Sequence, residues 1–294
     1  MLVPMKEILD RANRENYGVS APIVSMELDA RAALEAAEIC KSPVILGVVY
    51  QATPDIVLLG GYLTKLAEQT SVPVALNLDH GTDFSHALMA IKAGFTSIMV
   101  DCSTLGYEEN IAQVSELVKI AHAVGVSVEA ELGHVGLGSN YNPDCTQGLT
   151  DPEQALEYIK RTGIDCLAVA VGTAHGAYKG TPKIDFERLV QIKELTKFPL
   201  VLHGGSGSGD NNLKKLCQLG INKVNVANDL FQSAYTNLLK TDMTGNGIYY
   251  LWEACKVGYR TRLIELIDCF GSKGKSWITA KTGLSHKTME VKEI

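Results

Sequence analysis

Short, continuously apolar runs alternate with longer amphipathic stretches along the whole chain. Several of the longer stretches end at a glycine, which tolerates the left-handed backbone at a helix C-terminus, and a new apolar run follows each of them. These glycines are Gly94, Gly125, Gly163 and Gly220. The alternation predicts eight strands separated by helices, near residues 18–25, 43–49, 73–79, 97–101, 126–132, 166–171, 199–204 and 222–227.

The strand-like runs are apolar at successive positions rather than at every second one. This is typical of a parallel sheet whose two faces are both covered by helices. A count of eight favours an α/β fold with a single closed (β/α)8 TIM barrel over an open doubly wound sheet, and 294 residues suffice for it. We expect one barrel over residues 1–272. A polar C-terminal tail over 273–294 has no apolar stripe, so it decorates the barrel or frays.

The charge and composition exclude several classes of function. The formal net charge is −6 and no basic stripe is present, which argues against a nucleic-acid partner. No run reaches about 18 apolar residues and the first residues lack a signal-peptide pattern, so we expect no membrane partner and a cytoplasmic location. The seven cysteines are scattered without a Cys-x-x-Cys pair, which indicates reduced thiols in the core.

Polar side chains appear where the predicted strands end. His80 follows the third strand, His175 follows the sixth and His203 ends the seventh. A single histidine at such a place is more often structural, but three imidazoles converging at the C-terminal rim of a barrel form the ligand set of an open catalytic zinc site. Asp79, Asp101 and Glu131 end neighbouring strands and belong to the same candidate site. The other histidines have no comparable placement, and they are His86, His122, His134 and His286.

A candidate phosphate site follows the seventh and eighth strands. Residues 203–210 are rich in glycine, and residues 225–229 follow the next strand. A glycine-rich loop by itself is weak evidence, because the alternative interpretation is a simple tight turn. Its position beside His203 favours a phosphate cradle, in which backbone N–H groups and a helix N-terminus face the anion.

Five motifs in order along the chain carry a family resemblance. They are Asn77-Leu78-Asp79-His80-Gly81, Glu129-Ala130-Glu131-Leu132-Gly133, Gly172-Thr173-Ala174-His175-Gly176, Leu202-His203-Gly204-Gly205-Ser206-Gly207 and Lys223-Val224-Asn225-Val226-Ala227. Together they resemble the class II, metal-dependent ketose-bisphosphate aldolases, in particular the tagatose and fructose bisphosphate branch. The resemblance extends from about Ala21 to Ser272.

The resemblance implies a role for each matched residue. His80, His175 and His203 would bind Zn²⁺, Asp79 would be catalytic, and Asp101 and Glu131 would lie at an alternative or second metal position. The regions that bind the phosphate of dihydroxyacetone phosphate, often with a Na⁺ or K⁺ ion, would include Gly176, Lys179, Gly204, Ser206, Asn225, Ala227 and Asn228. The family also implies a phosphosugar substrate and a homodimer or homotetramer.

The implied reaction is the reversible cleavage of a ketose 1-phosphate or 1,6-bisphosphate to dihydroxyacetone phosphate and an aldehyde. Zinc would act as a Lewis acid that stabilises the enediolate formed when the C3–C4 bond breaks. Asp79 would take the proton of the C4 hydroxyl during cleavage and return it during condensation. The alternative for Asp79 is to orient a zinc-binding histidine.

One loop departs from the family pattern. The family has acidic residues after the fifth strand, one of which handles the C3 proton, but residues 136–141 contain none. Asp144, Tyr141 or water would take that proton, or the reaction is altered. Asn228 replaces a common threonine, an exchange that retains a hydrogen-bond donor. A metal-dependent phosphosugar isomerase or epimerase and a non-catalytic phosphosugar-binding protein remain alternatives, and the Asp79-His80 pair disfavours the second.

Overall fold

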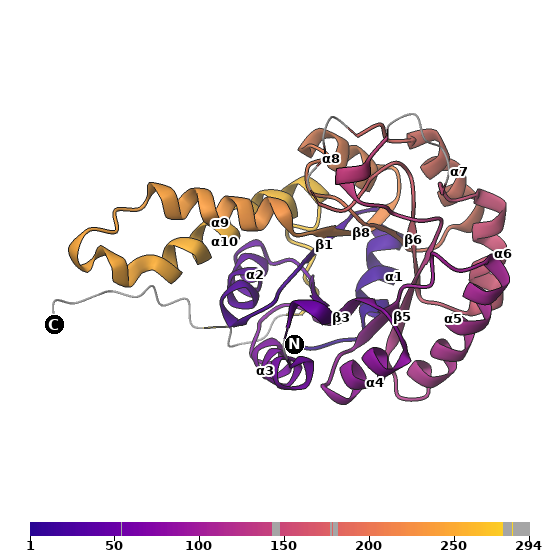
Figure 1. The fold of residues 1–294 in the computed structure, drawn as a ribbon, viewed down its shortest axis with the longest axis horizontal. Helices are drawn as coiled ribbons and strands as arrows, with labels where there is room; N and C mark the ends of the chain where they lie inside the picture. Colours follow the sequence, from indigo (N-terminus) through magenta and orange to yellow (C-terminus); the bar gives the residue numbers. More distant parts are fainter. Residues whose placement is uncertain (54, 143–147, 177, 179–181, 279–283, 285–294) are drawn as a thin grey trace.

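The computed structural model describes residues 1–53, 55–142, 148–176, 178, 182–278 and 284 (Figure 1). Eight strands lie close to the predicted positions: β1 Val19–Pro22, β2 Val44–Val49, β3 Val74–Gly81, β4 Ser97–Val100, β5 Ser127–Leu132, β6 Cys166–Val169, β7 Leu200–Leu202 and β8 Ile221–Val226. The α-helices are α1 Met5–Glu15, α2 Glu27–Cys40, α3 Ile56–Glu68, α4 Phe84–Lys92, α5 Tyr107–His122, α6 Pro152–Thr162, α7 Phe186–Thr196, α8 Asp210–Gln218, α9 Asn228–Lys240 and α10 Leu251–Phe270.

The strands form one parallel sheet that closes on itself. Their order is β1-β8-β7-β6-β5-β4-β3-β2. The two end strands meet where Ile23 bridges Gly47 and the Val24 amide donates to the Gly47 carbonyl at 2.8 Å. The connecting helices lie outside the ring of strands (Figure 1). The predicted TIM barrel is therefore confirmed.

The inside of the barrel is apolar at one end and polar at the other. Because side chains alternate along a strand, Ile45 of β2 faces an interior cluster while Val44 and Leu46 pack beneath the helices. Helix α1 closes the amino-terminal end by adding Met5, Ile8, Leu9 and Ala12 to that interior cluster. Polar side chains are buried beside this cluster and beyond it toward the carboxyl-terminal end, namely Asn77, Asp79, Glu129, Glu131, His203, Lys223 and Asn225.

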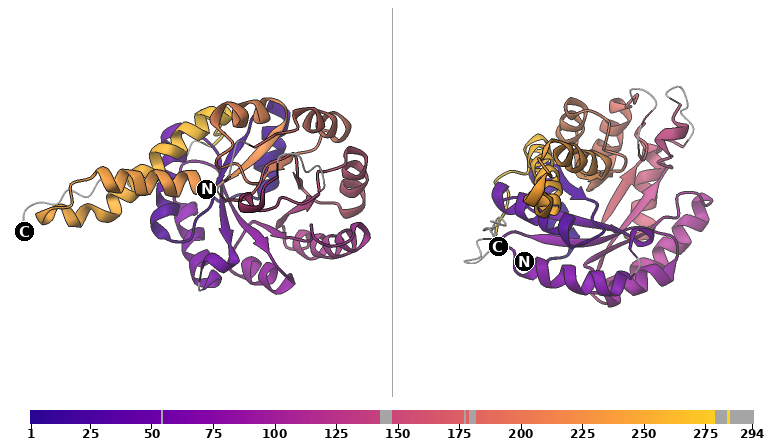
Figure 2. Two further views of the ribbon diagram at one scale, coloured as in Figure 1. Left: turned by 45° about the horizontal axis from the view of Figure 1, so that its top comes forward. Right: turned by 60° about the vertical axis from the view of Figure 1, so that its left-hand side comes forward.

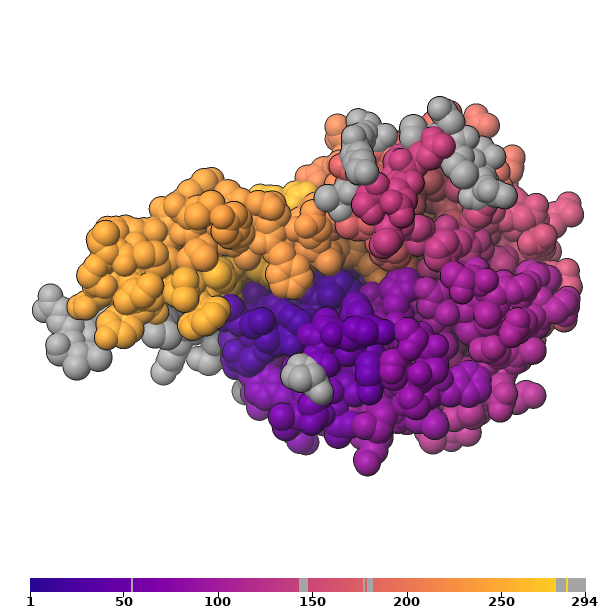
Figure 3. Space-filling view, viewed as in Figure 1, coloured from indigo at the N-terminus to yellow at the C-terminus, as the bar shows by residue number. Residues whose placement is uncertain are grey.

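Helices α9 and α10 form a hairpin that extends away from the barrel (Figures 1 and 2). The 3-10 helix η3 (Gly245–Tyr250) lies at the turn between them. The last turns of α10 return to the barrel, where Leu263, Leu266 and Ile267 are buried in the core beneath the helices. The space-filling view shows this hairpin, which we call the arm, as a projection from the rounded barrel (Figure 3).

The described beginning of the polar tail lies against the barrel. The amides of Gly274 and Ser276 donate to the carbonyls of Cys40 and Lys41 at 2.9 and 2.8 Å. Trp277 and Ile278 pack against the interior apolar cluster. The tail therefore helps α1 to cover the amino-terminal end of the barrel.

Two expectations from composition can be compared with the described residues. The cysteines among them are free thiols. Cys40, Cys102, Cys166 and Cys217 are buried, as predicted for thiols in the core, whereas Cys255 and Cys269 are only partly buried. Cys145 lies outside the described residues. No helix in the described parts of the chain is long and apolar enough to cross a membrane.

Candidate metal centre and active site

The three predicted histidines converge at the carboxyl-terminal end of the barrel. His80 is the second-last residue of β3, His203 directly follows β7, and His175 lies on the loop after β6. The ring centroids are 4.6 Å apart for His80 and His203, 4.8 Å for His80 and His175, and 5.6 Å for His175 and His203. Potential ligand atoms on the three rings all lie within 4.8 Å of one another, so they can surround one ion.

Carboxylates contact two of the three rings, in each case at the nitrogen that does not face the other histidine. Asp101 Oδ2 lies 3.0 Å from His80 Nδ1, and Glu129 Oε1 lies 2.7 Å from His203 Nε2. The other Asp101 oxygen accepts hydrogen bonds from the backbone amide and hydroxyl of Ser103 at 3.0 and 2.6 Å. His80 has a φ of +49°, a left-handed conformation that is uncommon for a residue with a side chain. Its backbone therefore turns at the point where the imidazole meets Asp101.

Asp79 lies close to His203 and is 3% exposed. The Asn225 side-chain amide donates to Asp79 Oδ1 at 2.9 Å. Burial alone would raise the pKa of Asp79, but its electrostatic interactions with His80, His203 and Lys223 outweigh burial, and the pKa is lowered. Asp79 is thus an oriented, ionised carboxylate, the form that a general base requires.

Glu131 points toward the centre from β5. Its Oε1 accepts a hydrogen bond from the Val135 amide at 2.9 Å, while its buried Oε2 has no hydrogen-bond partner among the described residues and lies 3.6 Å from His203 Nδ1. Burial is the main reason that the pKa of Glu131 is raised. His80, Asp101 and Glu131 form a second group able to hold a cation, at the position where the sequence predicts one.

The glycine-rich loop after β7 packs closely against the loop that carries His175. Gly204 has a φ of +66°, and an added Cβ would come within 2.3 Å of the Ala174 carbonyl oxygen, so only glycine fits. Ser206 Oγ accepts hydrogen bonds from the amides of Ala227 and Asp229, each at 3.2 Å. The loop is thereby tied to the N-terminus of α9, where backbone N–H groups favour an anion.

The remaining predicted phosphate residues lie at three different places. Asn228 is the first residue of α9 and lines a polar cavity of about 570 Å³ between α9 and α10. Gly176 is exposed, and an added Cβ would meet no atom within 4 Å. Asn225 contacts Asp79, and its Oδ1 is buried without a described partner. Lys179 lies outside the described residues.

Two tyrosines hold the loops after β5 and β6 in place. The Tyr141 hydroxyl donates to the Gly172 carbonyl at 3.1 Å and accepts from the Lys183 amide at 2.7 Å. The Tyr178 hydroxyl accepts from the Ala174 amide at 2.7 Å and donates to a carbonyl of the glycine-rich loop at 3.1 Å. Tyr141, a candidate for handling the C3 proton, therefore has its hydroxyl committed to the backbone. Asp144, the other candidate, lies outside the described residues.

Comparison with known proteins identifies the family. The family described as "Fructose-bisphosphate aldolase class-II" matches residues 3–275. The chain belongs to this family.

Relatives and a solved structure extend the match over nearly the whole chain. A fructose-bisphosphate aldolase of Geobacillus stearothermophilus is 41% identical over 94% of this chain and 99% of its own length. One of Thermus caldophilus is 41% identical over 84% of this chain and 89% of its own. The crystal structure of the YdjI aldolase from Escherichia coli K12 superimposes with a TM-score of 0.84 at 32% identity, covering 94% of this chain and 100% of that one.

The family is one of zinc-dependent lyases, and the histidine cluster fits such an ion. Because a carboxylate can only accept, His80 Nδ1 and His203 Nε2 carry their ring hydrogens. The other two nitrogens, His80 Nε2 and His203 Nδ1, then face each other at 2.7 Å. In two neutral rings both would be lone pairs that repel each other at this distance, so a proton is shared between them unless a metal ion binds both nitrogens.

The pKa values of His80 and His175 agree with this requirement. Burial alone would lower the pKa of His80, but Asp79 and Asp101 raise it to about 9, so the centre favours a positive charge. Burial, together with His203 and His80, lowers the pKa of His175 to about 3. The His175 imidazole is therefore neutral, and its buried Nε2 has no described hydrogen-bond partner. A neutral ring with a free nitrogen is what a divalent metal needs.

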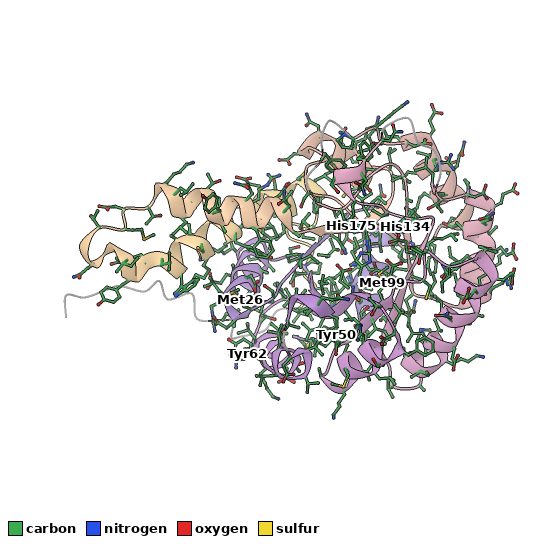
Figure 4. The ribbon with its side chains drawn as sticks, in the orientation of Figure 1. Met26, Tyr50, Tyr62, Met99, His134 and His175 are labelled. Carbon is green, nitrogen blue, oxygen red and sulfur yellow. The ribbon has the colours of Figure 1, made fainter. Side chains whose placement is uncertain are left out.

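Sequence reasoning missed three residues near the centre. His134, set aside on sequence grounds, lies with Nδ1 2.9 Å from Ser103 Oγ and 3.9 Å from Glu131 Oε1. Figure 4 shows it and His175 over the middle of the barrel. It follows a strand as directly as the chosen histidines do, so the same rule could have found it. Glu129 and Lys223 were missed although each lies two residues before a chosen residue of its strand.

Proposed function

We propose that this class II aldolase reversibly cleaves a ketose 1,6-bisphosphate to dihydroxyacetone phosphate and an aldehyde phosphate, with fructose 1,6-bisphosphate as the first substrate to test. The observation that carries the proposal is the convergence of three histidines next to the buried, oriented carboxylate of Asp79. The relatives named fructose-bisphosphate aldolase, at about 40% identity, support this substrate class. Membership of an aldolase family favours cleavage over isomerisation and over binding alone.

His80, His175 and His203 would hold the zinc ion. When bound there, zinc supplies a Lewis acid that polarises the carbonyl group of the ketose. Asp101 fixes the ring of His80, and Glu131 offers an unpartnered oxygen next to it, which supports a second or alternative metal position. The metal would compete with the proton for His80, so we expect metal affinity to fall as the pH is lowered.

Asp79 would remove the proton from the C4 hydroxyl of the ketose and return it in the reverse reaction. Its ionised state and its hydrogen bond from Asn225 suit a general base held in one orientation. In this proposal Asn225 acts through Asp79, in addition to the phosphate contact that the family implies.

The substrate phosphate would lie between the glycine-rich loop and the N-terminus of α9. Gly204 and Ser206 from the first, and Ala227 and Asn228 from the second, would surround it, and the family pattern adds Gly176 and Lys179 as further phosphate-binding residues. The close packing at Gly204 and the hydrogen bonds of Ser206 support a preformed anion site. A Na⁺ or K⁺ ion would assist phosphate binding. A comparison of cleavage rates in sodium chloride and in potassium chloride would test this.

A group must take up the proton at C3 of dihydroxyacetone phosphate. The described residues of the loop after β5 include no carboxylate that could do so. The Tyr141 hydroxyl is held by Gly172 and Lys183, so Asp144 is the better candidate in this loop. Hydrogen exchange at C3 of dihydroxyacetone phosphate measures this step separately from cleavage.

The arm supports a homodimer. The side chains at 231, 235 and 239 are four residues apart along α9 and form one exposed stripe, and large apolar side chains are also exposed on the rest of the arm. Six such side chains are between 41% and 66% exposed: Phe231, Tyr235, Leu239, Ile248, Tyr249 and Trp252. With aromatic side chains of about 150–250 Å² each, they expose roughly 600 Å². A stable interface buries about 800 Å² per partner, so a second copy of the arm provides a suitable cover.

Sedimentation velocity would test the dimer. Tyr235→Glu combined with Trp252→Glu should give a monomer, because charges would enter the exposed apolar surface of the arm on both of its helices. Leu58→Glu is a matched control, since Leu58 is 74% exposed on α3 and far from α9 in the chain. A wild-type monomer at micromolar concentration would contradict the proposal.

A coupled assay would test the reaction itself. Dihydroxyacetone phosphate released from fructose 1,6-bisphosphate can be reduced enzymatically and followed through NADH. We expect release that depends on zinc. A ketose phosphate product without dihydroxyacetone phosphate would indicate an isomerase or epimerase, and binding without turnover would indicate a binding protein.

A further inference from the structure

A buried ion pair lies inside the barrel next to His203, and none of the steps above uses it. Glu129 on β5 is 0% exposed and Lys223 on β8 is 1% exposed. Glu129 Oε2 accepts a hydrogen bond from Lys223 Nζ at 2.6 Å, and Glu129 Oε1 lies 2.7 Å from His203 Nε2. Each carboxylate oxygen is thus committed to a different partner.

Stability does not explain this pair. Moving two charges from water into a barrel interior costs several kcal/mol per ion, and well-packed apolar residues of the same size are often as stable or more so. Apolar side chains fill the adjoining part of the same barrel interior in that way, among them Ile45, Ala75, Ala168 and Val201. A charged pair at the polar end therefore calls for another role.

The geometry fixes which nitrogen of His203 is free. A neutral imidazole has one N–H and one lone pair, and the nitrogen next to an ionised carboxylate has to be the donor. Nε2 faces Glu129, so Nδ1 has the lone pair. Nδ1 lies 2.7 Å from His80 Nε2 and 3.6 Å from Glu131 Oε2, at the centre where the metal would bind.

We propose that Glu129 and Lys223 are positioning residues: Lys223 holds one oxygen of Glu129, and the other oxygen holds His203 in the tautomer whose Nδ1 faces the metal. The inference rests on the proposed three-histidine metal site. Asp79, Glu129 and His203 also form a cluster that could hold an ion. The proposal gives Glu129 a different role, in which it orients a metal ligand and does not bind the metal itself.

The wild-type protein provides the first test. With NMR-active cadmium bound in place of zinc and with nitrogen-labelled histidine, scalar coupling identifies the ring nitrogen that binds the metal. We expect coupling to Nδ1 of His203 and a protonated Nε2, whereas His80 should show the opposite pattern because Asp101 holds its Nδ1. Coupling to Nε2 of His203 would overturn the proposal without any variant.

The variant Glu129→Gln provides the second test. Lys223 can only donate, so it would take the single carbonyl oxygen of the glutamine and turn the NH₂ group toward His203. Nε2 would then have to accept, and Nδ1 would carry the hydrogen and lose its lone pair. We expect zinc affinity, measured by competition with a chromophoric chelator, to fall 10–100-fold, the usual effect of losing a group that orients a ligand.

Adding Lys223→Met to Glu129→Gln should restore part of the affinity. Without the ammonium group, the glutamine oxygen is free to turn back to His203. Glu35→Gln is a matched control, because Glu35 is 1% exposed and pairs with Lys256 at 3.3 Å and with Arg260, but lies on α2 outside the barrel. It should lower the melting temperature and leave zinc affinity unchanged.

The outcomes separate this inference from the proposed function. If wild type binds no zinc through its histidines, the metal site itself is wrong. If wild type binds zinc and Glu129→Gln binds it equally well, only the positioning role is wrong. A double variant no better than Glu129→Gln, or an equal loss of affinity in Glu35→Gln, would likewise overturn it. If Glu129→Gln does not fold, the cadmium coupling in wild type still decides.

Discussion

Replacing Asp79 tests the catalytic step most directly. Asp79→Asn keeps the size of the side chain and an oxygen that can accept from Asn225, but removes the negative charge and the ability to take a proton. A positioned acid-base group contributes roughly 10²–10⁴ in rate. Each factor of ten corresponds to about 1.4 kcal/mol, so the barrier to cleavage should rise by about 3–5 kcal/mol. Asp79→Ala should lose a similar factor and in addition leave the Asn225 amide without its partner.

Two measurements distinguish a general base from a residue that only orients His80. Zinc content, measured by elemental analysis, should remain close to one ion per chain, because Asp101 rather than Asp79 contacts the ring of His80. Exchange of the C3 hydrogen of dihydroxyacetone phosphate should continue, because that step does not involve the C4 hydroxyl. Cleavage at the wild-type rate with zinc bound would refute the assignment, and loss of zinc in step with loss of rate would make Asp79 a positioning residue.

Three further predictions concern the metal, the loop and the phosphate site. Removal of the metal by a chelator should abolish cleavage and added zinc should restore it, while circular dichroism of the metal-free protein remains that of a folded barrel, since its core is built from apolar side chains. Asp144→Ala should slow C3 hydrogen exchange, measured by NMR in heavy water, if Asp144 replaces the missing carboxylate; unchanged exchange would exclude it. Gly204→Ala should destabilise the protein by about 1–3 kcal/mol and raise KM, because its Cβ would overlap Ala174 at a positive φ; a melting curve and KM equal to wild type would contradict the packing argument.

Local patterns were sufficient to predict the barrel and most of the rim. Continuous apolar runs ending at polar residues predicted eight strands. The carboxyl ends of parallel strands meet at one end of a barrel whatever the exact register between the strands is. That is why His80, His175 and His203 could be grouped although they come from three separate motifs. The arm could not be predicted in the same way, because an amphipathic helix has the same pattern whether it covers its own barrel or extends from it.

The roles of individual atoms depended on the tertiary structure. Glu129 contacts His203 across 74 positions of sequence, Lys223 contacts Glu129 across 94, and Asn225 contacts Asp79 across 146. No local periodicity contains such pairs, since they arise only when the sheet closes and its inward side chains meet. The sequence by itself therefore determined the barrel, the family and the residues at its rim. Only the folded chain decided which nitrogen of each histidine is free and which carboxylates hold the rings, because hydrogen-bond geometry depends on distances of a few tenths of an ångström between distant strands.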